Sequence, residues 1–254
     1  MRVAVFSDVH GNLFSAEAVL EAIFAQGSFD AIVAAGDLCL GGSHPGDCVD
    51  LLKAENVQAV YGNTEAYLRD IQSKPPDELH QSMWHIIQPA GAWTISRLSD
   101  SQKEWLSGLP FEIHFAPTGR VQDELLVVHA NPKDVDRMIL PGETEQHRLW
   151  GELRQPDESP QMEELFLDVA PRAVAFGHLH TMFQRAWRGR HLVDVAGCSL
   201  PSIDHDMRAR FTIAEWKAGK WQFDQRWVVY DASREVAALQ SCDMPHWEHF
   251  MKYF

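Results

Sequence analysis

The first 63 residues repeat one alternation of apolar and polar positions three times. Short apolar runs over residues 3–6, 31–35 and 57–61 have the length of buried strands, and each run ends in a polar tip. Apolar residues at helical spacing predict a helix over 13–25, and a proline near its start marks a second helix over 45–55. Strand, polar tip and helix in this order are typical of βαβ units, so the pattern predicts an α/β fold with a parallel sheet.

The rest of the chain predicts further helices and strands. Residues 64–110 are expected to be mostly helical, with a capping box that begins at Ser99. Strands are expected over 111–115, 124–129 and 173–176, a helix over 160–169, short strands with turns at Gly189 and Gly219, and a helix with an aromatic-rich end over 232–254. We therefore expect a single domain over 1–254, with a helical insertion at about 64–110 and a strand and helix extension at about 211–254.

Composition and charge narrow the function classes. Apolar residues make up 45% of the chain and charged residues 23%, which is ordinary for a globular protein. A net charge of −14 disfavours general binding to nucleic acid or to anionic lipid. The apolar runs are too short for a membrane span, and the N-terminal stretch meets an acidic residue too early for a signal peptide. The four cysteines form no CxxC pair, so we expect reduced thiols in a cytoplasmic protein without a membrane partner.

The predicted strand tips carry side chains that can bind metal ions. Because the carboxyl ends of parallel strands meet at one edge of a sheet, these side chains can converge there. Each short motif alone is more typical of a turn or of a strand-end histidine, and only their order along the chain favours a metal centre. Mixed oxygen and imidazole ligands without thiolate favour Mn²⁺, Fe or Zn²⁺. The candidate ligands are Asp8, His10, Asp37, Asn63, His129, His178 and His180.

Taken in order, these motifs resemble those of the calcineurin-like metallophosphoesterases, whose pattern is D-x-H, G-D, G-N-H-(D/E), a strand-end H and G-H-x-H. A D-x-R-A-x-F stretch over residues 206–211 is similar to one in the compact bacterial branch of that family. The resemblance implies a four-layer α/β/β/α sandwich of two mixed sheets. It also implies two divalent metal ions, Mn²⁺ first and Fe, Zn²⁺, Ni²⁺ or Co²⁺ as alternatives. The matching segments are Asp8-Val9-His10, Gly36-Asp37, Gly62-Asn63-Thr64-Glu65, Val128-His129-Ala130 and Gly177-His178-Leu179-His180.

The resemblance further implies a role for each ligand. Asp8, His10 and His180 would hold one metal ion. Asn63, His129 and His178 would hold the other, and Asp37 would bridge the two. Two cations held in this way would clamp a phosphoryl group and generate a bridging hydroxide that attacks phosphorus. The chain is therefore expected to hydrolyse a small phosphorylated substrate, with Asp37, Asn63 and His129 as catalytic residues.

One position departs from the family pattern. Thr64 stands where the family usually has a histidine that is thought to protonate the leaving group or bind the phosphate. A hydroxyl of very high pKa cannot act as a general acid near pH 7. The sequence therefore favours a small phosphodiester, of a nucleotide-like kind, over an unactivated monoester. Asn12, His44, Thr64 and Arg137 are the candidate substrate contacts.

Two other functions stay open at this point. The first is a phosphomonoesterase whose acid comes from the helical insertion, with His85 as the candidate. The second is a non-catalytic binding scaffold on the same fold, against which the presence of all seven ligands argues. The aromatic residues Trp247, Phe250, Tyr253 and Phe254 could form a homodimer contact or could pack on their own core.

Overall fold

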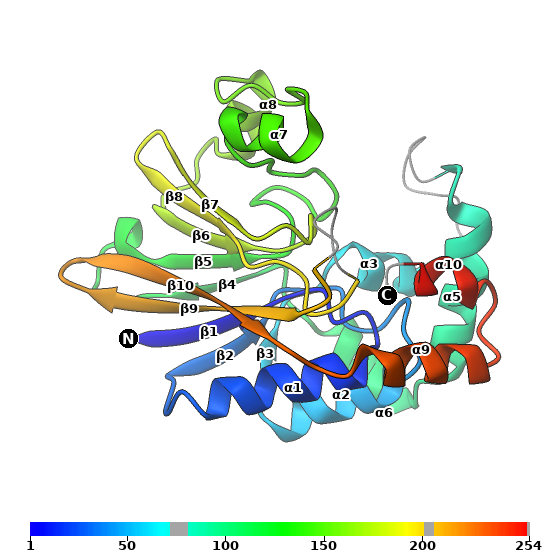
Figure 1. Cartoon of the computed structure of the whole chain (residues 1–254). Helices are drawn as coiled ribbons and strands as arrows, with labels where there is room; N and C mark the ends of the chain where they lie inside the picture. The colour runs from blue at the N-terminus through cyan, green and yellow to red at the C-terminus, as the bar shows by residue number, and fades with distance from the viewer. Residues whose placement is uncertain (72–80, 201–205, 253–254) are drawn as a thin grey trace.

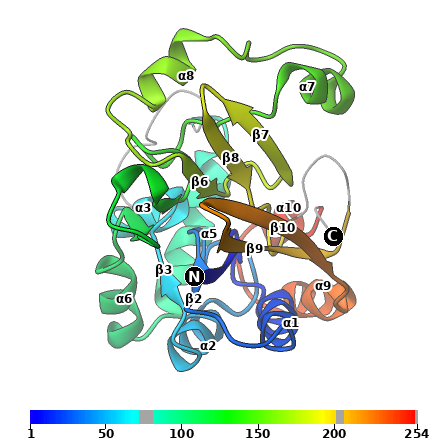
Figure 2. The same cartoon turned by 90° about the vertical axis from the view of Figure 1, so that its left-hand side faces the viewer.

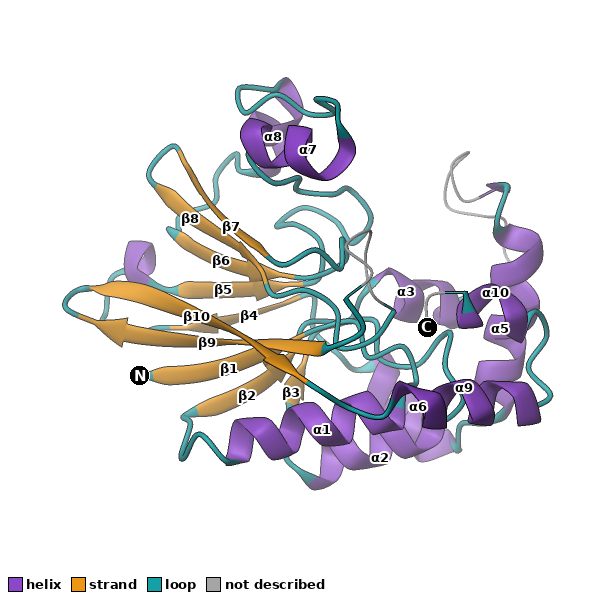
Figure 3. Cartoon of the chain, in the orientation of Figure 1, coloured by secondary structure: helices purple, strands orange, loops and turns teal. Residues whose placement is uncertain are grey.

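Two five-stranded sheets pack face to face between outer layers of helices in the computed structural model, which describes residues 1–71, 81–200 and 206–252 (Figure 1). Helices α1 and α2 cover the outer face of one sheet, and α7 and α8 lie beyond the other (Figure 3). Both sheets contain parallel and antiparallel pairs. The predicted α/β class and the α/β/β/α sandwich of two mixed sheets are confirmed.

The first sheet has the strand order β10-β9-β1-β2-β3. Its strands are β1 (Arg2–Phe6), β2 (Ala31–Ala34), β3 (Gln58–Ala59), β9 (Ala209–Lys217) and β10 (Lys220–Val228). The first three are parallel, as predicted, and β9 pairs antiparallel with β1. β3 is shorter than the run of apolar residues suggested. The expected extension over 211–254 thus contains most of β9 and all of β10, and β9 lies directly beside β1 in this sheet.

The second sheet has the strand order β4-β5-β6-β8-β7. Its strands are β4 (Glu112–Phe115), β5 (Leu125–Val128), β6 (Ala173–Phe176), β7 (Phe183–Trp187) and β8 (Arg190–Asp194), and the short helix η1 (Val121–Asp123) precedes β5. β5, β6 and β8 are parallel, and the two edge strands are antiparallel. The predicted turns at Gly189 and Gly219 join β7 to β8 and β9 to β10.

The helices follow the sequence pattern except where the pattern is weak. They are α1 (Leu13–Phe24), α2 (Pro45–Ala54), α3 (Asn63–Arg69), α5 (Trp84–Ser96), α6 (Asp100–Ser107), α7 (Glu143–Trp150), α8 (Pro160–Leu165), α9 (Ala232–Ser241) and α10 (Trp247–Met251). The capping box at Ser99 is present at the start of α6. The sequence did not predict α7, because only Gln146 of this helix is buried and it has no apolar stripe.

The core between the sheets is built from side chains that alternate along the strands. Val3 and Val5 from the first sheet pack with Leu125, Val127 and Val193 from the second. This packing fixes the two sheets against each other. The carboxyl ends of β1, β2, β5 and β6 lie at the same end of the molecule (Figure 1).

The C-terminal aromatic segment folds back onto its own chain. Phe250 is buried and packs with Leu40 and Met244. Tyr253 and Phe254 lie outside the described residues. The four cysteines are free. Across the described ranges, no helix has the length and apolar character that crossing a bilayer would require.

Truncation of Leu125 tests the packing between the sheets. Leu125 is fully buried, so Leu125→Ala should lower the free energy of unfolding by about 2–5 kcal/mol through lost apolar burial and the cavity left behind. Urea denaturation measures the change. Leu167→Ala is the matched control, because Leu167 is 62% exposed and should shift stability by no more than about 0.5 kcal/mol. Equal losses in the two variants would contradict this account of the core.

Candidate metal centre

The seven candidate ligands lie together at the edge of the sandwich where these strands end. Asp8 and His10 follow β1, Asp37 follows β2, and Asn63 begins α3 after β3. His129 follows β5, and the last two histidines follow β6. Five of the seven are buried and His178 and His180 are half-buried, so the sandwich encloses the cluster and leaves its histidine side partly open.

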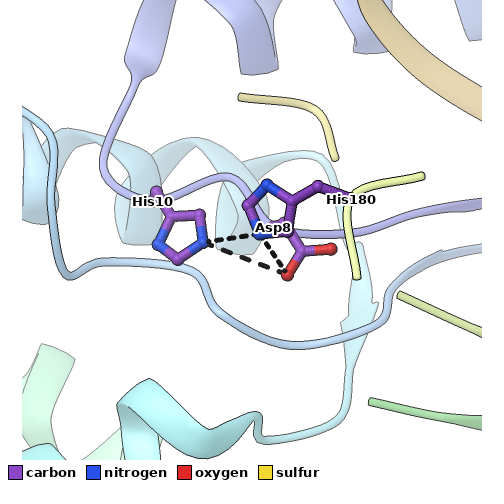
Figure 4. Close-up of side chains that lie close together, drawn as sticks. All are labelled: Asp8, His10 and His180. Carbon is purple, nitrogen blue, oxygen red and sulfur yellow. Dashed lines mark hydrogen bonds and ion pairs between the residues drawn. The ribbon is translucent and has the colours of Figure 1, made fainter. Parts of the chain in front are cut away.

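The first group of ligands contains Asp8, His10 and His180 (Figure 4). The two imidazole Nε2 atoms face each other at 3.2 Å. Asp8 Oδ1 lies 3.3 Å from His180 Nε2 and 4.0 Å from His10 Nε2. This oxygen is buried and accepts no hydrogen bond from the residues that the structure describes. Asp8 Oδ1 and the two Nε2 atoms therefore surround one point, where a metal ion could bind all three.

The second group contains Asn63, His129 and His178. Asn63 Oδ1 lies 2.9 Å from His129 Nε2 and 3.1 Å from His178 Nδ1. The two imidazole rings meet edge to face, with their centroids 5.0 Å apart. An amide oxygen and two imidazole nitrogens thus converge as a second set of three.

Asp37 lies between the two groups. Its Oδ2 atom is 3.7 Å from His10 Nε2, and its Oδ1 atom is 3.4 Å from His129 Nε2. One carboxylate therefore presents one oxygen to each group. This placement suits a carboxylate that bridges two cations.

Each of the four histidines uses its remaining ring nitrogen in a hydrogen bond to a backbone carbonyl. Such bonds fix which nitrogen carries the proton in the neutral ring and leave a lone pair on the nitrogen that points inward. The bonds are His10 Nδ1 to Leu40 O (2.8 Å), His129 Nδ1 to Ala35 O (2.8 Å), His178 Nε2 to Asp136 O (2.9 Å) and His180 Nδ1 to Leu200 O (2.5 Å).

The backbone at these ligands is held in an unfavourable conformation. Five of the seven have positive φ angles between 50° and 69°, namely Asp8, His10, Asp37, His178 and His180. A left-handed backbone in a non-glycine residue costs free energy, and it persists where the surrounding structure enforces it. The chain thus uses strained turns to aim its strand-end side chains at one place.

Two glycines before the ligands permit the close approach of these turns. A Cβ atom on Gly62 would lie 2.2 Å from Asp37 Oδ1, and one on Gly36 would lie 2.6 Å from His129 Nδ1. Gly36 also has a φ of +90°. The G-D and G-N motifs therefore have a steric origin, because a larger residue would displace the bridging carboxylate or its neighbouring imidazole.

Thr64, predicted as a substrate contact, holds Asp37. Its backbone N–H and its hydroxyl donate to Asp37 Oδ1 at 2.9 and 3.0 Å. The next residue, Glu65, is buried and accepts the backbone N–H groups of Asp37, Leu38 and Gly62. The sequence analysis gave Glu65 no role of its own. Its place in the first turn of a helix, where a carboxylate can accept backbone N–H groups, was the signal that could have indicated this role.

Asn12 and Arg137, which are also predicted substrate contacts, make hydrogen bonds and ion pairs within the protein. Asn12 is buried and caps α1, where its side chain accepts the N–H of Ser15. Its amide nitrogen donates to Ser199 and Tyr230. The guanidinium of Arg137 is paired with two surface carboxylates, those of Asp134 and Glu164.

His44 is held by a buried carboxylate that the sequence analysis missed. Glu235, on α9, accepts the N–H and the hydroxyl of Ser43, both at 2.8 Å. That hydroxyl also lies 2.6 Å from His44 Nδ1. The loop that follows Asp37 is therefore tied to the C-terminal helix. His85 of the helical insertion makes an edge-to-face contact with His246, at a centroid distance of 6.2 Å.

Tyr67 links the two segments that carry the second group of ligands. It lies one helical turn after Asn63 on α3, and its hydroxyl donates to Asp136 Oδ1 at 2.8 Å. The backbone carbonyl of Asp136 is the one that receives the bond from His178. The helical spacing from Asn63 was a signal that the sequence analysis did not use.

The electrostatics of the cluster favour cations. Burial opposes the charge of Asp8, but attraction to His180 outweighs it and holds the pKa of the carboxyl well below its usual range. Burial lowers the pKa of His180, yet attraction to Asp8 raises that pKa to about 9. Burial and the charge of His129 lower the pKa of His178 to about 4. Positive charge is thus stabilised beside Asp8, where protons and metal ions compete for the same nitrogen.

The donor set fits two divalent cations. Oxygen and imidazole ligands without thiolate suit Mn²⁺, Fe or Zn²⁺. The buried Asp8 Oδ1 without a hydrogen bond, the facing nitrogens of His10 and His180 and the split oxygens of Asp37 are each accounted for by cations at these two positions.

Comparisons with known proteins concern the family and the fold of the chain. The family model described as calcineurin-like phosphoesterase matches residues 1–182. An uncharacterized protein of Methanocaldococcus jannaschii, MJ0912, is 29% identical over 131 residues, which are 52% of this chain and 50% of the relative. The match thus spans about half the length of that curated relative.

Two solved structures share the fold over nearly the whole chain. A metallophosphoesterase from Sphaerobacter thermophilus has a TM-score of 0.71 at 20% identity, covering 100% of this chain and 98% of its own. The hypothetical protein PH1004 from Pyrococcus horikoshii OT3 has a TM-score of 0.75 at 16% identity, covering 99% and 96%. At these identities the likeness concerns the fold alone.

Substitution of Gly62 tests the steric origin of the G-N motif. Gly62→Ala should displace Asp37 and lower the bound metal per chain, measured by elemental analysis after gel filtration. Gly119→Ala is the matched control, because a Cβ atom there would meet no atom within 4 Å. Full metal content in Gly62→Ala would show that the loop accommodates the added methyl group.

Glu235 predicts a pH dependence of stability. Burial raises the pKa of its carboxyl from 4.5 to about 7, against the opposing hydrogen bonds from Ser43. Between these values the folded chain binds this proton more tightly than the unfolded chain does. Its contribution to the free energy of unfolding is therefore complete below pH 4.5 and is lost as the pH rises to 7, by up to about 3 kcal/mol. Urea denaturation across this range should give a flatter curve for Glu235→Gln than for the unsubstituted protein, whereas parallel curves would refute the assignment.

Proposed function

Because the chain belongs to the calcineurin-like phosphoesterase family, we propose that it is a binuclear metal-dependent enzyme that hydrolyses a small phosphodiester. The observation that carries the proposal is the convergence of seven ligand side chains in two groups, with one oxygen of Asp37 facing each group. All seven ligands are retained, which a purely structural use of the fold would not require.

Two bound divalent cations, Mn²⁺ by preference, would polarise the phosphoryl oxygens and lower the pKa of a water molecule at the centre. Asp8, His10 and His180 would hold one of them. Asn63, His129 and His178 would hold the other, and Asp37 would bridge them. In the neutral ring, the outward hydrogen bond of each histidine places the proton on the outer nitrogen and leaves the inward nitrogen as the metal ligand.

The charges of the protein groups explain how such a site would attract an anion. Its ligands include two carboxylates, Asp8 and Asp37, and the oxygen of Asn63 is neutral. Two dications would therefore retain about two units of positive charge after the carboxylates are counted, enough to bind a phosphate group inside a chain of net charge −14. Thr64 and Glu65 would hold Asp37 and its loop in place as that charge is bound.

The substrate class follows from the hydroxyl of Thr64. Because this hydroxyl donates to Asp37 Oδ1, it is not aimed at a leaving group, and its pKa is too high for a general acid near pH 7. The insertion residue His85 is turned toward His246. We therefore favour a diester or another ester whose leaving group departs with little help from an acid.

Removal of a ligand from the second group tests the proposal. His129→Ala should lower the metal content from two ions toward one per chain and reduce hydrolysis of an aryl phosphodiester with Mn²⁺ by at least about 100-fold, since even outer-shell changes at metal sites cost about 10–100-fold. His114→Ala is the control, because His114 is partly exposed on β4 and pairs with Glu124. The unsubstituted protein should hydrolyse the diester faster than the matching monoester. Unchanged hydrolysis in His129→Ala would refute the metal centre, and a faster monoester reaction would refute the diester preference.

A further inference from the structure

A groove of about 510 Å³ lies at the opposite edge of the two sheets from the metal centre. Its walls come from the β9–β10 hairpin of one sheet and from the starts of β6 and β8 in the other. Figure 2 views the molecule from this edge, with the two hairpins side by side. A neighbouring hollow of about 500 Å³ continues it and shares Arg172 and Arg190 as lining residues. The two hollows together form what we call the basic groove.

The basic groove is cationic although the chain as a whole is strongly acidic. Arg172, Arg190 and Lys220 line it, and none of them forms an ion pair within the described part of the chain. The other arginines along it are already neutralised, because Arg185 pairs with Asp157 and Arg188 pairs with Glu158.

Among the residues lining the basic groove, Asp123 is the carboxylate, and it is already engaged. Its Oδ2 accepts hydrogen bonds from Thr118 and Arg120 at 2.7 and 2.8 Å. Asp123 also attracts Arg172, so the basic groove holds three cations, Arg172, Arg190 and Lys220, beside one engaged carboxylate.

The cations of the basic groove are unfavourable to one another without an anion. The Nε atom of Arg190 is buried and has no acceptor among the described residues. Burial and the charge of Arg172 both lower the pKa of Arg190. Burial and the charge of Lys220 likewise lower the pKa of His191. The guanidinium of Arg190 donates through another nitrogen to the backbone carbonyl of Val169 at 2.6 Å and lies over the ring of Trp187. An anion placed here would relieve the repulsion between the cations.

Two tryptophans form an apolar wall beside these charges. Trp216 and Trp221 meet edge to face with their centroids 5.7 Å apart, and both line the basic groove. The indole N–H of Trp221 donates to the backbone carbonyl of Asp123, which fixes the ring. Fixed aromatic faces beside arginines suit a planar organic group attached to a phosphate.

We propose that the basic groove is a second binding site, separate from the metal centre, for a small molecule that carries a phosphate or diphosphate group. Arg172, Arg190 and Lys220 bind the phosphate oxygens. Trp216 and Trp221 contact the organic part. The size of the groove and the acidity of the surrounding chain favour a small ligand over a nucleic acid strand.

Calorimetric titration of the metal-free protein tests this site alone. In the presence of a chelator, inorganic pyrophosphate should bind with one ion per chain, since the metal centre then has no cations. Arg172→Ala combined with Lys220→Ala should weaken binding at least tenfold. Lys217→Ala is the control for Lys220, because it removes one positive charge from the same hairpin but from a lysine paired with Glu215, and it should change the dissociation constant less than twofold.

A second ligand tests the aromatic wall. Adenosine diphosphate should bind more tightly than pyrophosphate, and Trp216→Ala should abolish that difference while leaving pyrophosphate binding in place. Absence of saturable pyrophosphate binding would overturn the proposal, as would equal weakening by Lys217→Ala. Salt-dependent binding of an RNA oligonucleotide in preference to both ligands would overturn the small-molecule assignment. Because these titrations use no metal, their failure leaves the proposed phosphoesterase activity untouched.

Discussion

Four imidazoles turned inward toward two carboxylates require the rest of the site to be rigid. Each ring is held by a hydrogen bond from its outward nitrogen to a backbone carbonyl, and those carbonyls belong to loops that follow other strands or ligands. His10 is bonded to the loop after Asp37, and His129 is bonded to the end of β2. The ligands from the two sheets therefore hold one another, and the sheets cannot slide without breaking these bonds.

The sandwich provides the stability that this arrangement costs. A left-handed backbone at a non-glycine residue costs on the order of 1–3 kcal/mol, and five of the ligands have it. The apolar layer between the sheets, with Val5, Val127 and Val193 fully buried, lies directly behind these turns. The close packing of the core therefore keeps the strained turns at the sheet edge from relaxing.

The convergence of the candidate ligands could be predicted from the sequence because a pattern of apolar runs shows where strands end. Asp8, Asp37 and His129 each follow such a run directly. The roles of the supporting residues could not be predicted in this way. Glu235 accepts a hydrogen bond from a loop nearly two hundred positions away in the sequence. The hydroxyl of Thr64 donates to Asp37, a contact that the sequence pattern does not predict. Such contacts depend on how the elements pack, which periodicity does not encode.

The same limit applies to elements and surfaces without a hydrophobic signature. Helix α7 has one buried residue, so its pattern predicted no helix. The basic groove draws its cations from three separate turns, and no run of basic residues marks it in the sequence. The parallel strands of both sheets begin at the edge where the groove lies and end at the candidate metal centre. The two proposed anion sites are therefore at opposite ends of the same strands, and the net charge of −14 would repel long polyanions from either one. A small phosphate compound carries too little charge for this repulsion to exclude it. The net charge of the chain would therefore select small anions over long polyanions before either contacts a site.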